Sequence, residues 1–143
     1  MSLAYLHLLT NHLPILGVMF AVLLLVFAVI NKQQNTTFSA YLIMLVAGIG
    51  GIIAYFTGEA AEESVEHLPG ISEKIIHLHE EMAENVLLLI FLLTASSVLG
   101  IWAHVSGSRY AKKFETYMLV LGIICFVLFA FTGYLGGHIR HGN

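Results

Sequence analysis

The side chains best suited to chemistry gather in one stretch of the chain, residues 56–85. Eight of the nine acidic residues are glutamates in this stretch, and three of the eight histidines accompany them. Carboxylates at this density repel one another unless water, protons or cations neutralise them, and neutral imidazole is the commonest metal ligand in proteins. The stretch therefore indicates either a metal or haem site or a strongly acidic surface.

Helical spacing would bring these residues together in groups. Side chains that are three, four or seven positions apart share one face of a helix. Two such faces result: Glu59 with Glu62, Glu63 and Glu66, and His77 with Glu80 and Glu84. Pro69-Gly70 separates the two groups and predicts a turn between them. The sequence thus predicts an acidic helical hairpin.

Four apolar runs indicate where this hairpin stands. Each is 18 or 19 residues long and holds no charged residue: 13–30, 38–56, 86–103 and 117–135. A helix needs about 20 such residues to cross the hydrocarbon core of a bilayer. The chain is 58% hydrophobic and 10% charged, against about 25% charged in soluble domains. We predict an all-α membrane protein, a single domain of residues 1–143 folded as an up-down bundle of four transmembrane helices.

Polar breaks give the expected limits of the four helices. Thr10 or Asn11 can cap the first helix, and Ser72 precedes the third. The helices are expected at about 11–31, 38–67, 72–105 and 110–139. Small residues at 47–54 should let a neighbouring helix approach the second one closely.

Cationic residues are distributed unevenly between the two ends of this bundle. Four of the six lie in the first and third loops: Lys32, Arg109, Lys112 and Lys113. Loops rich in Lys and Arg stay in the cytoplasm, so both termini and the acidic hairpin are expected on the periplasmic side of a bacterial inner membrane. No basic stripe indicates a nucleic-acid partner, and the single cysteine, Cys125, excludes an internal disulfide.

Each predicted helix contributes one chemical group at a similar depth in the membrane. His12, Glu59, Glu84 and His138 lie one to three residues outside their apolar runs. At a helical rise of about 1.5 Å per residue, all four stand within roughly 5 Å of the hydrocarbon edge. Carboxylates so close to hydrocarbon need a partner, which favours a bound cofactor or metal at this edge.

A first hypothesis is a b-type haem inserted among the helices at this edge. A haem with two histidine ligands needs imidazoles on facing helices, each with its second ring nitrogen hydrogen-bonded. His12 can face His79 across the bundle, and His138 is a further candidate ligand. Such a protein would exchange electrons with a periplasmic cytochrome c, a quinone or a larger respiratory complex.

A second hypothesis is a bare metal ion, or a pair of ions, held by carboxylates and imidazoles. Four-helix bundles build such sites from glutamates and Glu-x-x-His pairs on facing helices, and His77-x-x-Glu80 is that pair reversed. Mixed histidine and glutamate ligands suit zinc, iron or copper. The candidate ligands are Glu59, Glu63, His77, Glu80 and Glu84.

A third hypothesis is an accessory subunit of a respiratory complex. Its acidic hairpin would dock basic periplasmic partners, such as many cytochromes c. No nucleophile elbow or oxyanion-hole motif accompanies the serines that lie near histidines. We therefore expect an electron-transfer or binding protein rather than a stand-alone enzyme.

Short motifs at the helix ends add a family resemblance. They are His12-Leu13-Pro14, Thr57-Gly58-Glu59-Ala60, His79 and Thr132-Gly133-Tyr134-Leu135-Gly136-Gly137. Together, over nearly the whole chain, they resemble an uncharacterised family of bacterial four-helix membrane proteins, in which a histidine followed by a proline opens the first helix. Some members are fused to c-type cytochrome domains, so the resemblance implies a redox role with His12 and His79 as haem ligands. His138 and the dense glutamates of residues 59–66 lie outside that pattern.

Overall fold

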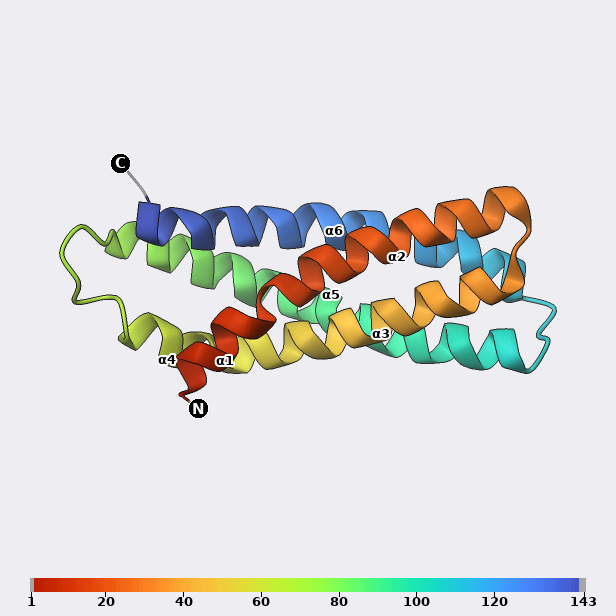
Figure 1. Ribbon diagram of the computed structural model, residues 1–143, viewed down its shortest axis with the longest axis horizontal. Coiled ribbons are helices and arrows are strands. Elements are labelled where there is room, and N and C mark those ends of the chain that lie inside the picture. Colours follow the sequence, from red (N-terminus) through yellow and green to blue (C-terminus); the bar gives the residue numbers. More distant parts are fainter. Residues whose placement is uncertain (1, 142–143) are drawn as a thin grey trace.

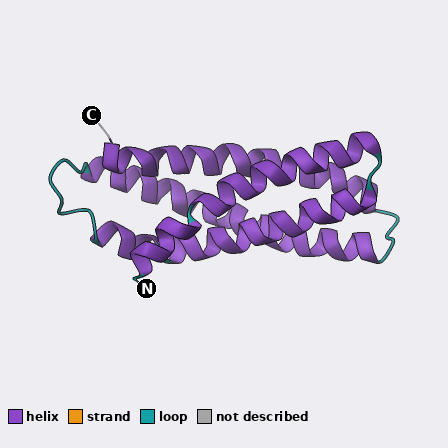
Figure 2. Cartoon of the chain, in the orientation of Figure 1, coloured by secondary structure: helices purple, strands orange, loops and turns teal. Residues whose placement is uncertain are grey.

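The structure is a bundle of helices. The computed structural model describes residues 2–141, and within them every regular element is a helix (Figure 2). The helices, in chain order, are α1 Leu3–Thr10, α2 His12–Asn31, α3 Gln34–Phe56, α4 Gly58–Glu63, α5 Glu73–Val105 and α6 Ala111–His141. The predicted all-α fold is therefore confirmed.

Four long helical segments run up and down the bundle (Figure 1). The segment formed by α1 and α2, and the helices α3, α5 and α6, are each long and apolar enough to cross a membrane. α2 packs against α3 and α6, and α5 packs against the same two helices, so the four close into a ring. The chain is an integral membrane protein by this architecture, and the short helices α1 and α4 lie at the end that also holds both termini (Figure 1).

Apolar side chains cover the outside of the bundle as well as its core. Leu25, Met44 and Leu93 are fully buried between the helices. Leu88 and Trp102, by contrast, expose 75% and 66% of their surface. Removing apolar surface from water is worth about 25 cal/mol per Å², so lipid rather than water is the solvent in which this exterior is stable.

Small residues bring α2 and α3 close together. A Cβ atom added to Gly17 of α2 would lie 2.8 Å from the Cβ atom of Ala47, and one added to Gly50 of α3 would lie 2.8 Å from that of Leu13. Both distances are too short for real carbon atoms, so any larger side chain would push the helices apart. The small residues at 47–54 therefore form a packing seam, as their composition predicted.

The first span begins earlier than the sequence suggested. It starts at Leu3 rather than near residue 11, and Ser2 caps it. Asn11 interrupts the span between α1 and α2 without forming a side-chain cap, and it keeps right-handed helical dihedral angles. The Thr10 hydroxyl donates back to the Leu6 carbonyl at 2.8 Å instead of capping α2. Thr10 and Asn11, which were expected to cap the first helix, therefore lie at a joint inside one long helical segment.

The second span is broken at Thr57. The sequence predicts one helix over residues 38–67, whereas α3 begins four residues earlier at Gln34 and stops before Thr57, and α4 ends at Glu63. The Thr57 hydroxyl donates to the Ile53 carbonyl at 2.7 Å, and such back-bonding competes with the regular helical pattern. The third and fourth spans match their expected limits to within two residues.

Gly17→Ala should destabilise the bundle, because the new methyl group would meet Ala47 of α3. Overpacking of this kind costs about 1–3 kcal/mol. Gly137→Ala is the matched control, since nothing lies within 4 Å of a Cβ atom at that position, and it should be neutral or stabilising. Thermal unfolding in detergent, followed by circular dichroism, measures both; equal melting temperatures would contradict the close packing of α2 on α3.

Candidate functional site

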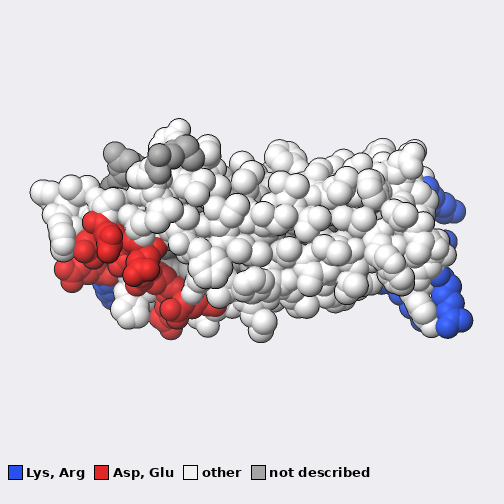
Figure 3. All heavy atoms as spheres, turned by 90° about the horizontal axis from the view of Figure 1, so that it is seen from below, with Lys and Arg blue, Asp and Glu red and all other residues white. Residues whose placement is uncertain are grey.

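Charge is segregated between the two ends of the bundle. Figure 3 shows acidic side chains gathered at the end where α4 lies, and most basic side chains at the opposite end. The acidic end consists of α4, the connecting residues 64–72 and the first turns of α5. The predicted acidic hairpin is therefore present, and the candidate site lies at this end.

His7 of α1 is held by the end of α3. Its Nδ1 atom lies 2.7 Å from the carbonyl oxygen of Ala54. The last carbonyl groups of a helix lack partners in the same helix, and the break at Thr57 puts Ala54 in this position. The Thr57 hydroxyl also donates to the Ala54 oxygen, at 3.2 Å. The break in the second span thus creates the acceptor that fixes His7.

His79 of α5 is held in a similar way by α6. Its Nδ1 atom lies 2.9 Å from the carbonyl oxygen of Thr132. Gly136, one helical turn beyond Thr132, has no side chain to cover that carbonyl, and a Cβ atom there would lie 3.1 Å from Cε1 of His79. The glycine therefore makes room for the imidazole, which is half-buried between the two helices.

These two contacts determine which ring nitrogen carries the proton. A carbonyl oxygen only accepts hydrogen bonds, so Nδ1 is the donor in both His7 and His79. In neutral imidazole the other nitrogen, Nε2, then has a free lone pair, as in metal-binding histidines that are held by an outer partner. The two rings are also near enough to interact electrostatically. Two histidines from different helices thus have a free Nε2 atom at one end of the bundle.

The other predicted haem ligands are placed differently. His12 is exposed. His138 donates its Nδ1–H to the Tyr134 carbonyl of its own helix at 3.0 Å, and its ring lies 4.2 Å from the Tyr134 ring. The structure brings His7, rather than His12, into interaction with His79. The apolar character of residues 3–10, which extends the first span, is the signal that could have identified His7.

Asn11 adds an unpartnered polar atom at the joint between α1 and α2. It follows His7 by four residues, so the two side chains lie on the same side of the segment. Its Oδ1 atom is buried and has no hydrogen-bond partner among the described residues. A buried acceptor without a partner costs about 1–3 kcal/mol, so a hydrogen-bond donor brought by a ligand would be stabilised there.

The acidic hairpin contains a pair of interacting carboxyl groups. Glu62 of α4 and Glu80 of α5 share a hydrogen bond, which together with partial burial and the neighbouring negative charges raises the pKa of Glu62 to about 7. The two residues border a cavity of about 240 Å³, whose other lining residues are Glu66, His67, Glu73, Ile76 and His77. Of the predicted metal ligands, His77 and Glu80 therefore line one cavity, with Glu62 as a partner that the sequence analysis left out.

The remaining predicted metal ligands lie outside this cavity. Glu59, Glu63 and Glu84 are exposed and do not line it. Across the residues that the structure describes, no three His, Cys, Asp or Glu side chains are arranged to hold a metal ion.

Comparison with known proteins gives no match: no protein-family model, no curated protein and no solved structure is detectably similar to this chain. The chemistry of the acidic end is therefore the basis for assigning a function.

The proton shared by Glu62 and Glu80 should make stability depend on pH. Because the pKa of Glu62 is about 7 in the folded chain, above its ordinary value of 4.5, the folded state binds this proton more tightly than the unfolded state. Stability should therefore fall as the pH rises from about 4.5 to about 7. Glu62→Gln cannot titrate, so its melting temperature in detergent should fall less over this range than that of the wild type.

Glu63→Gln is the matched control for this measurement, because Glu63 is exposed and lies outside the carboxyl pair. It should keep the wild-type pH profile. An unchanged profile in Glu62→Gln would show that the two carboxyl groups do not share a proton.

Proposed function

We propose that this chain is a membrane-embedded haem protein that binds b-type haem through His7 and His79 and transfers electrons at one face of the membrane. The observation that carries the proposal is the pair of ring contacts, from His7 to Ala54 at 2.7 Å and from His79 to Thr132 at 2.9 Å. A hydrogen bond of this kind orients an imidazole and makes its other nitrogen a better ligand.

The number of prepared ligands favours haem over a bare ion. Haem iron is already bound by the porphyrin and takes only its axial ligands from the protein, whereas a structural zinc ion takes four. Among the described residues, two imidazoles with a free Nε2 atom, His7 and His79, are held by a carbonyl group of another helix, and no three side chains form a metal-binding set. Two imidazoles are the complement of a bis-histidine haem.

Small residues and one polar side chain lie near the two histidines. A Cβ atom added to Gly58 would lie 3.7 Å from Cε1 of His7, and one added to Gly136 would lie 3.1 Å from Cε1 of His79, so both rings pack directly against a glycine. The buried Oδ1 atom of Asn11 offers a hydrogen-bond acceptor on the same side of the helical segment as His7. Bound haem would supply one-electron redox chemistry, and the two histidines would hold it and help to set its reduction potential.

A second candidate function is the binding of a bare metal ion in the hairpin cavity. Glu62 and Glu80 hold a proton between them near neutral pH, and a cation can neutralise such a pair in its place. His77 lines the same cavity, and carboxylate with imidazole suits zinc, iron or copper. The support for this candidate is the proton shared by Glu62 and Glu80, and His7 would not be a ligand.

The absorption spectrum of the detergent-purified protein tests both candidates. Wild-type protein should show a Soret band and, after reduction with dithionite, the α-band of a b-type haem. His7→Ala and His79→Ala should lose most of this absorbance, because each removes an axial ligand. His12→Ala is the matched control at an exposed histidine and should keep the spectrum.

Two results would contradict the haem proposal. A His79→Ala variant with a wild-type spectrum would exclude the ligand assignment. A colourless wild-type protein that retains zinc, iron or copper in elemental analysis would exclude haem and favour the second candidate; in that case Glu80→Gln, rather than His7→Ala, should release the metal.

We further propose that the acidic end faces the periplasm of a bacterial inner membrane and docks basic electron carriers such as cytochromes c. The support is the segregation of charge, because cationic segments next to membrane spans stay in the cytoplasm and four of the six cationic residues, Lys32, Arg109, Lys112 and Lys113, lie in or beside the two loops at the opposite end. An acidic surface steers positively charged partners toward it.

Cysteine labelling in intact cells should establish this orientation. Ser64→Cys lies in the connection between α4 and α5, and Ser106→Cys follows the end of α5; both positions are exposed. A membrane-impermeant maleimide should label the first in intact cells and the second only after permeabilisation. The native Cys125 is fully buried and should not contribute. The reverse pattern would invert the orientation and leave the haem proposal untouched.

A further inference from the structure

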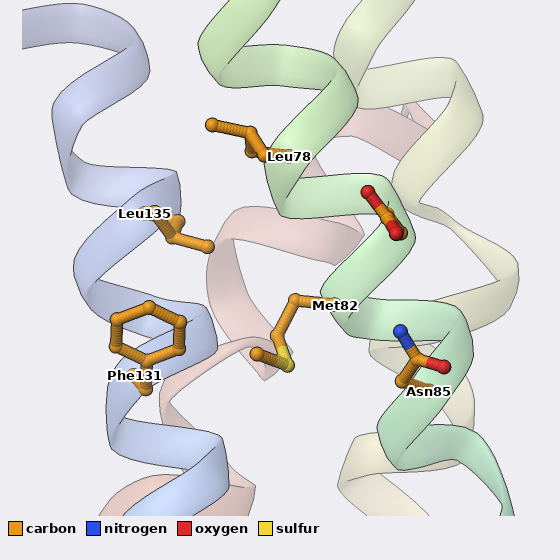
Figure 4. A pocket seen from close by; sticks show the side chains of 6 residues that line it. Leu78, Met82, Asn85, Phe131 and Leu135 are labelled. Carbon is orange, nitrogen blue, oxygen red and sulfur yellow. The ribbon is translucent and has the colours of Figure 1, made fainter.

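A second cavity lies between α5 and α6, beside the proposed haem ligands. Its volume is about 250 Å³, and it is lined by Leu78, Glu81, Met82, Asn85, Phe131 and Leu135. Figure 4 shows Leu78 and Met82 of α5 and Leu135 of α6 extending into the space between the two helices. This volume admits one substituted six-membered ring and is below the roughly 300–1,000 Å³ of most drug-sized sites.

The cavity stands at the membrane edge and is open to the side of the bundle. Asn85 directly precedes the apolar run of residues 86–103, and Phe131 and Leu135 belong to the last turns of the run 117–135. Leu78 and Phe131 expose 41% and 46% of their surface. A ligand would therefore enter from the bilayer, at the depth where lipid tails meet head groups.

The cavity and His79 use the same pair of helices. Leu78 and Met82 are one and three residues from His79 along α5. On α6, Phe131 and Leu135 directly precede Thr132, which binds the His79 ring, and Gly136, on which that ring packs. The cavity and the His79 imidazole therefore lie against the same segments of α5 and α6.

We infer that this cavity binds the head group of a membrane-dissolved quinone or quinol. Met82 and Phe131 offer a thioether and an aromatic ring, both of which pack well against a flat ring. Glu81 and Asn85 are one helical turn apart, so their side chains leave the helix roughly 5–6 Å from each other, similar to the separation of two oxygens on opposite sides of a six-membered ring. The carboxylate accepts a quinol O–H, and the amide can serve either redox form.

Charge argues against an anionic phospholipid as the occupant. Glu81 is part of the acidic end, and its carboxylate repels a lipid phosphate. A lipid tail would contact Leu78, Met82 and Leu135 without using the two polar side chains. A neutral ring with two hydrogen-bonding oxygens dissolves in the membrane and can contact both the apolar and the polar side chains of the cavity. The role of this molecule as an electron donor or acceptor rests on the proposed haem function, whereas its binding does not.

Photolabelling tests the inference directly. Purified protein in phosphatidylcholine nanodiscs is irradiated with an azido-benzoquinone that carries a decyl tail, and the labelled peptides are identified by mass spectrometry. Label should fall on residues 78–85 and 131–135, and unlabelled decyl-benzoquinone should compete it away. Asn85→Leu and Glu81→Leu should each weaken the competition about tenfold, as expected for the loss of one hydrogen bond to the ligand.

A pair of bulky substitutions provides the steric control. Leu135→Trp fills the cavity and should abolish competed labelling, whereas Leu88→Trp, at a position of α5 that is 75% exposed and outside the cavity, should not. Label that spreads over all lipid-facing residues, or that survives in Leu135→Trp, would overturn the inference. So would equal competition by added phosphatidylglycerol.

The outcome can be separated from that of the haem proposal, because photolabelling needs no haem and the absorption spectrum needs no quinone. Competed labelling of a colourless protein would overturn the haem function alone. A haem spectrum without competed labelling would overturn this inference alone.

Discussion

The exclusion of charge from hydrocarbon is the constraint from which the arrangement of this molecule follows. A charged side chain at the bilayer centre costs at least about 2.5–3.5 kcal/mol, and the four apolar runs hold none. Groups that could do chemistry are therefore confined to the two ends, with carboxylates and histidines at one and most cations at the other. Even the buried carboxylate Glu115 lies at the start of α6, outside the apolar run 117–135.

The membrane imposes a second requirement, that backbone polar groups find partners within the protein. At the acidic end, a histidine of the candidate site meets part of this requirement. The helix break at Thr57 leaves the Ala54 carbonyl without its regular helical partner, and His7 donates to it. The Thr132 carbonyl accepts from His79 beside Gly136. The His7 bond thus gives the Ala54 carbonyl a partner, whereas the Thr132 carbonyl lies inside the continuous helix α6. Together the two bonds connect α1 to α3 and α5 to α6, and they set the tautomer of both rings.

Length and hydrophobicity were enough to predict the four spans. Both are properties of the local sequence, and whether a helix can cross the hydrocarbon core depends on little else. The acidic hairpin and the small-residue seam of α3 were predictable for the same reason. The pairing of His7 with His79, and of Glu62 with Glu80, was not. Spacing along a helix says which residues share a face, but each of these pairs joins two helices whose relative rotation is decided by packing in three dimensions.

The position of α1 shows how a local cue can mislead. Thr10 and Asn11 are residue types that commonly cap helices, yet Asn11 keeps helical dihedral angles and the Thr10 hydroxyl bonds within its own helix. Burial against α3 and α4 outweighs the capping preference, since α1 packs on both. The extra helical turns carry His7 to the acidic end, where the sequence pattern had favoured His12.

The way His79 is held has a consequence for how the chain can evolve. Its partner on α6 is a main-chain oxygen, which almost any residue at position 132 would supply, so the identity of Thr132 is free to drift. Position 136 has less freedom, because a Cβ atom there would lie 3.1 Å from Cε1 of His79 and the imidazole would have to shift. Diverged relatives that keep this contact should have a histidine near the start of the third span and a glycine near the end of the fourth. The residue that supplies the accepting carbonyl should vary, so sequence comparison would not identify it.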